Sequence, residues 1–260
     1  MKKIFLALAL LVSTALMAQN DTLRSGVYSW KNTKSEMAGK VERRKILEGS
    51  TLDLANLEIH SSTLLPGETN HPLKATMDAE ELIIIKGGTA KATVEDSTKT
   101  LGPGGLILLL AGDKQSILNT SDKPLTYYVL AYKSKDGLNI QRGKAGGGSF
   151  MKDWRDYVTL KTDKGESRPI FDQPSSMFKR FDVHATALNP GKASHPPHTH
   201  RTEEIILMIK GSGEIQIGET FHKATIGDVI LLNSNVPHAF KNTGKEQCGY
   251  FAIQWHSNAE

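Results

Sequence analysis

The sequence contains a single cysteine, Cys248, among its 260 residues. One thiol excludes an intramolecular disulfide, a CxxC redox centre and a cysteine-based zinc ribbon. Lysine and arginine total 32 and give a net charge of +4, but they form no long basic run. Nucleic acid is therefore not expected as a partner. The hydrophobic content of 38% and charged content of 23% are those of an ordinary globular protein.

Long apolar runs are also absent, except at the N-terminus. Lys2 and Lys3 precede an unbroken apolar run over residues 4–12, and small residues follow over 13–18. This order is typical of a secretory signal peptide, and the run is too short to span a bilayer. We expect residues 1–18 to be removed, giving a periplasmic or secreted protein with no membrane span after cleavage.

The rest of the chain repeats itself. Residues 44–72 align with residues 168–196 at an offset of 124, and from Glu80 onward the offset is 123. The register then holds for some 90 residues in all, which predicts a duplicated domain. The matched pairs include His60 with His184, Glu80 with Glu203, Glu81 with Glu204, Gly88 with Gly211, and Gly104 with Gly227.

Each copy has the pattern of a β domain. Short apolar runs such as 82–85, 106–110 and 205–209 are separated by Gly, Pro, Asn and Asp. Many short strands with such turns predict a sandwich or small barrel. The runs are continuous rather than alternating, so both faces of these strands must be covered. Two barrels packed on each other, or a homodimer, would cover them.

Histidines are concentrated in the second copy, which holds seven of the nine. His198 and His200 lie on one face of an extended segment because side chains alternate along a strand. Glu204 opens the next apolar run, and His238 follows the run at 229–232. Three imidazoles and a carboxylate suit one divalent transition metal: Mn, Fe, Ni, Co or Zn. Four protein ligands leave open positions on an octahedral ion, as a catalytic site requires.

These residues resemble the motifs of the cupin superfamily. His198-x-His200-x3-Glu204-x6-Gly211 matches the first cupin motif, and the segment from Gly227 through His238 to Asn242 has the spacing of the second. Asn233 and Asn235 stand where Pro and Gly are customary, and Asn tolerates the left-handed backbone that such a turn needs. The resemblance implies a bicupin, that is, two tandem RmlC-like jelly-roll (double-stranded β-helix) barrels. Its metal ligands would be His198, His200, Glu204 and His238.

The first copy lacks this ligand set. Gln115 aligns with His238, and Ala75 and Met77 (or Lys74 and Thr76) align with His198 and His200. Only Glu81 matches a ligand. We therefore expect the first barrel to be structural, with a weak ligand pocket around His60, Glu81 and Gln115 as the alternative.

Several other residues are expected near the second site. Ile206 shares the strand face of Glu204 and predicts an apolar pocket wall, to which Gln216 and Phe240 would add. His184 is either exposed to solvent or a catalytic acid/base facing the metal. His195 is expected at the rim, and Glu203 in the packing interface.

The predicted organisation is a signal peptide at 1–18, a first cupin barrel at 19–135, a linker at 136–167 and a metal-binding barrel at 168–260. We expect an enzyme acting on a small oxygen-rich metabolite, of hydrolase or aminohydrolase, isomerase or lyase type. The layout is similar to that of (S)-ureidoglycine aminohydrolases, although that family orders its ligands differently and has Gln in place of His238. Two alternatives remain: an iron or nickel dioxygenase resembling the flavonol-cleaving bicupins, and a cupin that binds a small ligand without catalysis.

Overall fold

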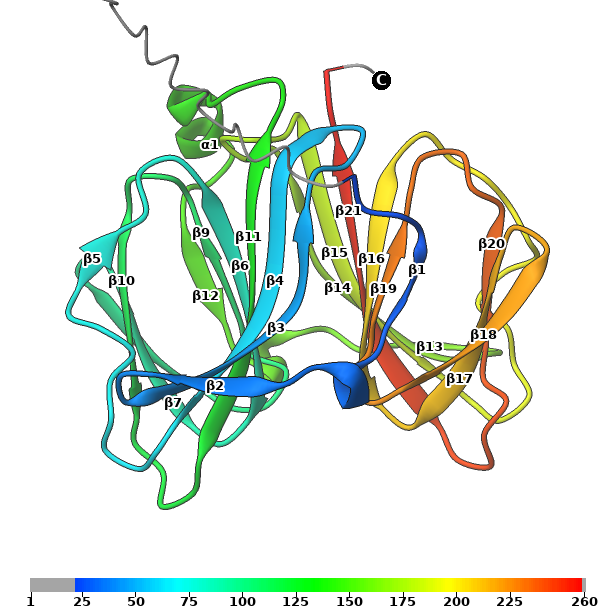
Figure 1. Cartoon of the computed structure of the whole chain (residues 1–260), viewed down its shortest axis with the longest axis horizontal. Helices are drawn as coiled ribbons and strands as arrows, with labels where there is room; N and C mark the ends of the chain where they lie inside the picture. The colour runs from blue at the N-terminus through cyan, green and yellow to red at the C-terminus, as the bar shows by residue number, and fades with distance from the viewer. Residues whose placement is uncertain (1–21, 259–260) are drawn as a thin grey trace, which may run out of the picture.

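The computed structural model describes residues 22–258, so the predicted signal peptide lies outside the described residues. Two β barrels lie side by side (Figure 1), which confirms the prediction of an all-β fold with tandem jelly-roll barrels. Within residues 22–258, the helical segments are α1 (Ile140–Ala145) and two single-turn 3-10 helices, η1 (Trp30–Asn32) and η2 (Trp154–Asp156). No helix in that range is both long and apolar enough to cross a membrane.

The first barrel consists of a seven-stranded and a four-stranded antiparallel sheet. In spatial order, the large sheet contains β12 (Phe150–Lys152), β9 (Leu106–Leu109), β6 (Glu80–Gly87), β11 (Leu125–Ser134), β4 (Leu54–Leu64), β3 (Val41–Gly49) and β2 (Ser35–Ala38). The small sheet contains β5 (Lys74–Ala75), β10 (Lys114–Asn119), β7 (Ala90–Val94) and β8 (Ser97–Leu101).

The second barrel repeats this plan. Its large sheet contains β1 (Gly26–Tyr28), β19 (Val229–Leu232), β16 (Glu203–Lys210), β21 (Cys248–His256), β15 (Arg180–Leu188), β14 (Gly165–Gln173) and β13 (Leu160–Thr162). Its small sheet contains β18 (Thr220–Thr225), β17 (Ser212–Ile217) and β20 (His238–Lys241). A β-bulge recurs at the same place in both copies, after Lys45 in β3 and after Pro169 in β14.

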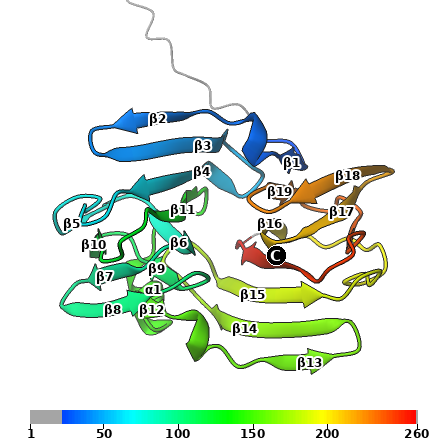
Figure 2. The same cartoon turned by 90° about the horizontal axis from the view of Figure 1, so that it is seen from below.

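The two copies exchange their first strands. β1 comes from the N-terminal side of the first copy but pairs with β19 of the second barrel, and β12 pairs with β9 of the first barrel. Figure 2 shows β1 beside β19. The offset of 124 that relates the copies also relates β1 to β12 and Trp30 to Trp154.

Because of this strand exchange, the segment predicted as a linker, 136–167, is folded into both barrels. The segment contains α1, β12, η2 and β13, and its last strand belongs to the second barrel, which therefore begins before residue 168. The predicted first barrel likewise includes β1, which the sheet order assigns to the second barrel. Three-residue strands stabilised by backbone pairing with distant partners leave no alternation for sequence reasoning to detect.

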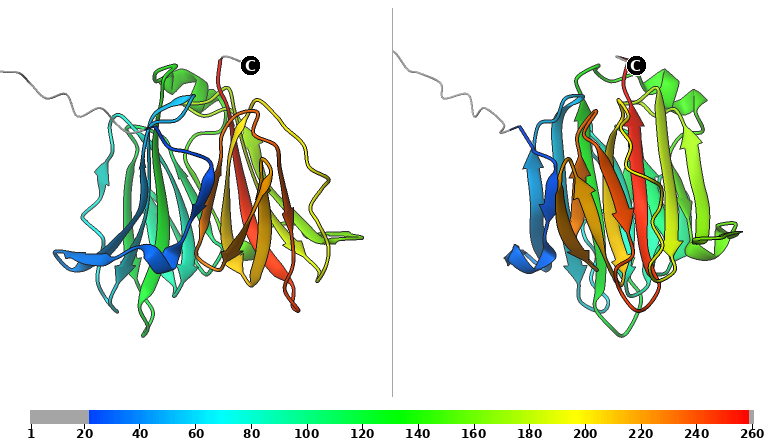
Figure 3. Two further views of the ribbon diagram at one scale, coloured as in Figure 1. Left: turned by 45° about the vertical axis from the view of Figure 1, so that its right-hand side comes forward. Right: turned by 90° about the vertical axis from the view of Figure 1, so that its right-hand side faces the viewer.

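The core lies in three places. One cluster fills the first barrel and includes Ile83 and Ile107; another fills the second and includes Ile206 and Ile230. The third and largest lies between the two large sheets, where the two barrels meet in the left view of Figure 3. Packing of the barrels within one chain thus covers the second face of the continuous apolar strands.

Aromatic rings make up the centre of the inter-barrel core. Phe178 stacks on Tyr132 with ring centroids 5.0 Å apart and lies 6.1 Å from Trp255. Full burial of such side chains contributes about 1.5–3 kcal/mol each, so the interface is a major source of stability for both barrels.

Candidate metal centre

The four predicted ligands come from three neighbouring parts of the second barrel. His198 and His200 lie on the segment that leads into β16, Glu204 is the second residue of β16, and His238 is the first of β20. Two backbone hydrogen bonds pair His198 with His238, at 3.2 and 3.0 Å. This pairing brings the two motifs together although 40 residues separate them in sequence.

Their side chains converge. The ligand atoms of His198, His200 and His238 all lie within 4.8 Å of one another. The Oε2 atom of Glu204 is 3.4 Å from Nε2 of His200 and 3.5 Å from Nε2 of His238. Because metal–nitrogen and metal–oxygen distances are about 2.0–2.2 Å, donor atoms at these separations can share one ion.

Hydrogen bonds on the far side of two rings fix their orientation. Nδ1 of His200 donates to the carbonyl oxygen of Thr202, and Nδ1 of His238 donates to that of Val236, both at 2.8 Å. With the proton on Nδ1, Nε2 keeps its lone pair and faces the other ligands. Metal-binding histidines are commonly held by such bonds.

The charges of the cluster also suit a cation. Burial alone would raise the pKa of Glu204, but the imidazole rings of His200 and His238 beside it lower that pKa to about 2, so the carboxylate is ionised. Burial and the neighbouring imidazoles lower the pKa of His198, which favours its neutral, metal-binding form. The donor set of neutral imidazoles and one buried carboxylate therefore fits a divalent transition metal.

The turn before β20 carries the two asparagines that depart from the customary motif. Asn235 has φ of 59°, the left-handed conformation expected for this position. Its backbone N–H donates to the carbonyl oxygen of His200 at 2.8 Å. The turn thus connects the two motifs through the backbone as well as through the ligands.

A cavity of about 380 Å³ opens from the cluster into the barrel. His198, Glu204 and His238 lie at its wall, together with Ile206 and Phe240 as expected from their strand faces. Gln216 does not line this cavity; it faces a groove on the outer side of the small sheet, because its neighbours Ile215 and Ile217 take the inner face.

His184 also faces the cavity. It is paired with Ala252, which is paired in turn with Ile206, so His184 lies two strands from β16, or about 10 Å. Its Nδ1 is 3.4 Å from Oδ1 of Asp182, an orientation that leaves Nε2 for the cavity. The structure therefore places His184 on the lumen side and not on the outer surface.

His195 lies at the cavity rim, and its ring is 3.9 Å from that of His198. The lining residues that sequence reasoning did not single out include Lys164, in the β13–β14 turn, and Gln254, in β21. The Thr-Asp-Lys-Gly turn at 162–165 signals a hairpin that positions Lys164. Gln254 shares a strand face with Tyr250 and Ala252, and this alternation was available in the sequence.

The first barrel does not bring its candidate residues together as a ligand set. Glu81 accepts a hydrogen bond from Thr76, Gln115 contacts His71, and His60 pairs with Glu58. Within residues 22–258, the one group of three or more metal-binding side chains found is that of the second barrel.

The fold and the site together define a two-barrel β protein with a cluster of three histidines and a glutamate in its second barrel. A family model described as "Cupin domain" matches residues 185–254, the segment that contains all four candidate ligands. Residues 185–254 are therefore a cupin domain, and the whole chain has the two-barrel fold of a bicupin.

Relatives and solved structures agree with this assignment. The chain is 21% identical over 212 residues to a probable (S)-ureidoglycine aminohydrolase of Oryza sativa subsp. japonica, which covers 77% of this chain but 60% of the rice protein. The chain thus spans less than two thirds of that relative.

Two solved structures show the same fold at low identity. Protein Ylba from E. coli has a TM-score of 0.71 and 12% identity, covering 92% of this chain and 95% of its own. The oxalate decarboxylase of Lactobacillus farciminis, in complex with formate, has a TM-score of 0.69 and 13% identity, covering 92% and 88%.

Proposed function

We propose that the protein is a metal-dependent enzyme acting on a small oxygen-rich metabolite by hydrolytic or lyase chemistry. The observation that carries this proposal is that one cavity contains both the candidate metal cluster and a separate imidazole, that of His184. The cluster consists of His198, His200, Glu204 and His238. A volume of about 380 Å³ suits a small molecule.

A metal held by His198, His200, Glu204 and His238 would polarise a carbonyl or lower the pKa of water. His184 has the position of a general acid or base, because it faces the cavity without belonging to the ligand cluster. Asp182 orients its Nδ1 side, so Nε2 can take a proton from, or return one to, a bound substrate.

The rim supplies a further charged group. Nζ of Lys164 donates to the carbonyl oxygen of Ser194 at 2.6 Å and lines the cavity mouth. Asp163 and Glu166 line the same cavity, with Glu166 in an ion pair with Arg168. The Lys164 ammonium group is a cation beside them that can bind a substrate carboxylate. Two proteins similar to this chain are named as an aminohydrolase and as an oxalate decarboxylase, so ureido or amino acids and short oxo- or dicarboxylic acids are the substrates to test first.

The test is a screen of the metal-loaded protein against these acids, with release of ammonia and of carbon dioxide as readouts. For the turned-over substrate, we expect His184→Asn to lower kcat by about 10²–10⁴-fold while metal content is unchanged. His222→Asn, on an exposed strand, is the matched control.

Other outcomes select the alternatives. Consumption of dioxygen without release of ammonia or carbon dioxide from these acids would favour the dioxygenase, whose support is the donor set of three histidines and one glutamate. Binding of acids without turnover of any of them would favour a non-enzymatic ligand-binding cupin.

We also propose export, on the strength of the signal-peptide pattern over residues 1–18. Expression of the full chain followed by N-terminal sequencing tests it. Export predicts a mature protein beginning near residue 19 in the periplasm or medium, and an uncleaved cytoplasmic product would contradict it.

A further inference from the structure

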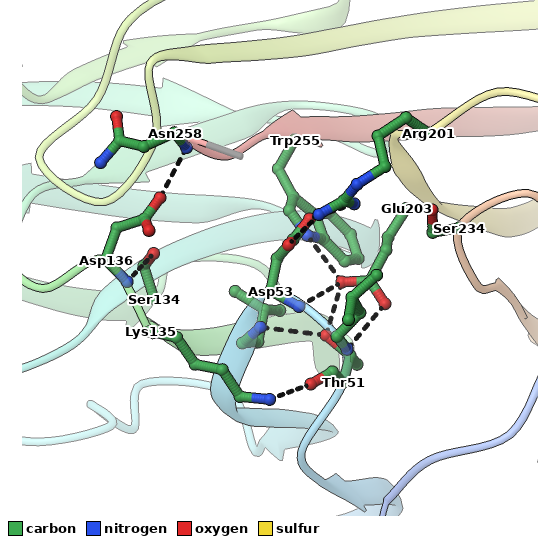
Figure 4. Close-up of polar contacts among 12 residues, drawn as sticks. Thr51, Asp53, Ser134, Lys135, Asp136, Arg201, Glu203, Ser234, Trp255 and Asn258 are labelled. Atoms are coloured by element: carbon green, nitrogen blue, oxygen red, sulfur yellow. Dashed lines mark hydrogen bonds and ion pairs between the residues drawn. The ribbon is translucent and has the colours of Figure 1, made fainter. Parts of the chain in front are cut away.

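The carboxylate of Glu203 is buried at the boundary between the barrels, with none of its surface exposed. It accepts hydrogen bonds from Oγ1 of Thr51 at 2.6 Å and from the backbone N–H groups of Leu52 and Asp53, both at 3.1 Å. Nε1 of Trp255 donates to it as well, at 3.3 Å. A residue adjacent to ligand Glu204 is thus held by a loop of the first barrel (Figure 4).

The first copy makes the equivalent contact on the opposite side of the interface. Glu80, which aligns with Glu203, accepts hydrogen bonds from Oγ of Ser175 at 2.7 Å and from the N–H of Ser176 at 2.6 Å. Ser175 aligns with Thr51. Each barrel therefore forms hydrogen bonds to the other through a buried glutamate, whether or not it contains a metal cluster. These two contacts alone are a structural part of the interface between the barrels.

A second contact occurs only beside the metal cluster. Arg201 donates two hydrogen bonds to the carboxylate of Asp53, at 2.9 and 2.7 Å. Only 5% of the Asp53 side chain is exposed, against 29% of Arg201, so the carboxylate of the pair is shielded from solvent. The aligned residues on the other side are Asp78 and Met177, which cannot form an ion pair; Asp78 pairs with Lys133 within its own barrel.

Arg201 and Glu203 flank Thr202, whose carbonyl oxygen accepts the hydrogen bond from Nδ1 of His200. The loop of the first barrel thereby holds both neighbours of the group that orients a ligand histidine. Figure 4 shows Arg201 and Glu203 reaching the same loop from one side.

We propose that Asp53 of the first barrel is a positioning residue for the metal centre of the second, acting through Arg201. This inference rests on the proposed function, since it assumes that the cluster binds a metal. It gives the first barrel, which lacks a ligand set of its own, a part in the site.

The experiment compares Asp53→Asn with Ser175→Ala, the matched interface control on the side without a metal cluster. Co²⁺ is titrated into each metal-free protein, and its visible absorption bands report both affinity and ligand geometry. We expect Asp53→Asn to bind Co²⁺ about tenfold more weakly, as is usual when a group behind a metal ligand is lost, with altered bands. Ser175→Ala should bind within twofold of the wild type, although both variants unfold at lower temperature.

A double-mutant cycle identifies the route. If Asp53 acts through Arg201, then Arg201→Gln and the double variant should bind Co²⁺ as weakly as Asp53→Asn, without additivity. Additive losses would contradict this route. Wild-type affinity and bands in Asp53→Asn would overturn the proposal and leave Asp53 a purely structural residue.

Hydrogen exchange in the metal-free proteins separates this inference from the proposed function. Asp53→Asn should speed amide exchange in residues 200–204, and Ser175→Ala should not. A wild type that binds no Co²⁺ would contradict the proposed metal site, whereas unchanged exchange in Asp53→Asn would contradict the positioning role.

Discussion

The orientation of individual side chains determines whether the four ligands can act together. Backbone carbonyl groups at Thr202 and Val236 accept the Nδ1 protons of two histidines, and the buried Glu204 carboxylate lies between their Nε2 atoms. The ligand types were visible in the sequence, but the carbonyl partners were not, because a backbone acceptor has no sequence signature.

Asn235 has a backbone conformation that few residue types adopt easily. Its left-handed φ of 59° is easy for Gly and Asn but costly for a β-branched residue. We expect Asn235→Gly to change the free energy of unfolding by less than about 0.5 kcal/mol and Asn235→Val to lower it by about 1–2 kcal/mol. Urea denaturation measures both, and equal stability of the two variants would contradict the turn geometry.

The contribution of Glu58 to the stability of the fold depends on pH. A hydrogen bond from His60 outweighs burial and, with the nearby charge of Arg43, lowers the pKa of Glu58 from 4.5 to about 2. A carboxyl group with a lowered pKa stabilises the folded state above its unfolded pKa, and this contribution is lost as pH falls from about 4.5 towards 2.

We therefore expect Glu58→Gln to cost about 1 kcal/mol at pH 7, a figure reduced for solvent screening of the partly exposed pair. The difference from wild type should shrink below about pH 4.5. Thermal unfolding across this range measures it, with Glu48→Gln, which removes an exposed ion pair with Lys45, as control. A difference that stays constant with pH would contradict the role of ionised Glu58.

At the scale of elements, the exchanged strands β1 and β12 are the main feature that sequence reasoning missed. The repeat was detected from Arg44 onward because matched residues are frequent there. The earlier match of Trp30 with Trp154 lies in a segment where identical pairs are few and scattered. The pattern of apolar and polar residues also does not indicate which barrel a three-residue strand will join, because its partner strand lies far away in the chain.

The two tryptophans complete the exchange by packing on aligned glycines, Trp154 on Gly104 and Trp30 on Gly227. A Cβ added to Gly104 would collide with the indole of Trp154. Gly218 also has positive φ, of 60°, but open space around it. It is therefore a control for backbone strain alone.

We predict that Gly104→Ala lowers the free energy of unfolding by about 1–3 kcal/mol more than Gly218→Ala does, because overpacking adds to the backbone cost. Urea denaturation of the two variants gives the difference. Equal losses would show that Trp154 does not constrain this position.

At the scale of the whole molecule, the barrels depend on each other. The largest core cluster lies between them and draws residues from both, and each large sheet ends in a strand supplied by the other copy. The sequence predicted two barrels and a covered strand face, and it left open whether the second barrel or a second chain provides the cover. Long-range packing decides that question.

We expect residues 22–258 to unfold in one cooperative transition. A fragment of residues 22–135 should fail to fold cooperatively, because it lacks β12 and exposes the inter-barrel aromatic face. Far-ultraviolet circular dichroism during thermal unfolding distinguishes the two. A soluble fragment with its own sharp transition would contradict interdependence.

The central claim is that one metal ion binds at His198, His200, Glu204 and His238. Elemental analysis of residues 22–258 tests it most directly, beside His200→Ala/His238→Ala and the exposed control His222→Ala. We predict about one equivalent of Mn, Fe, Co, Ni or Zn in the wild type and control, and a loss of that metal in the double variant. No metal in the wild type after anaerobic reconstitution, or equal metal in all three proteins, would contradict the account.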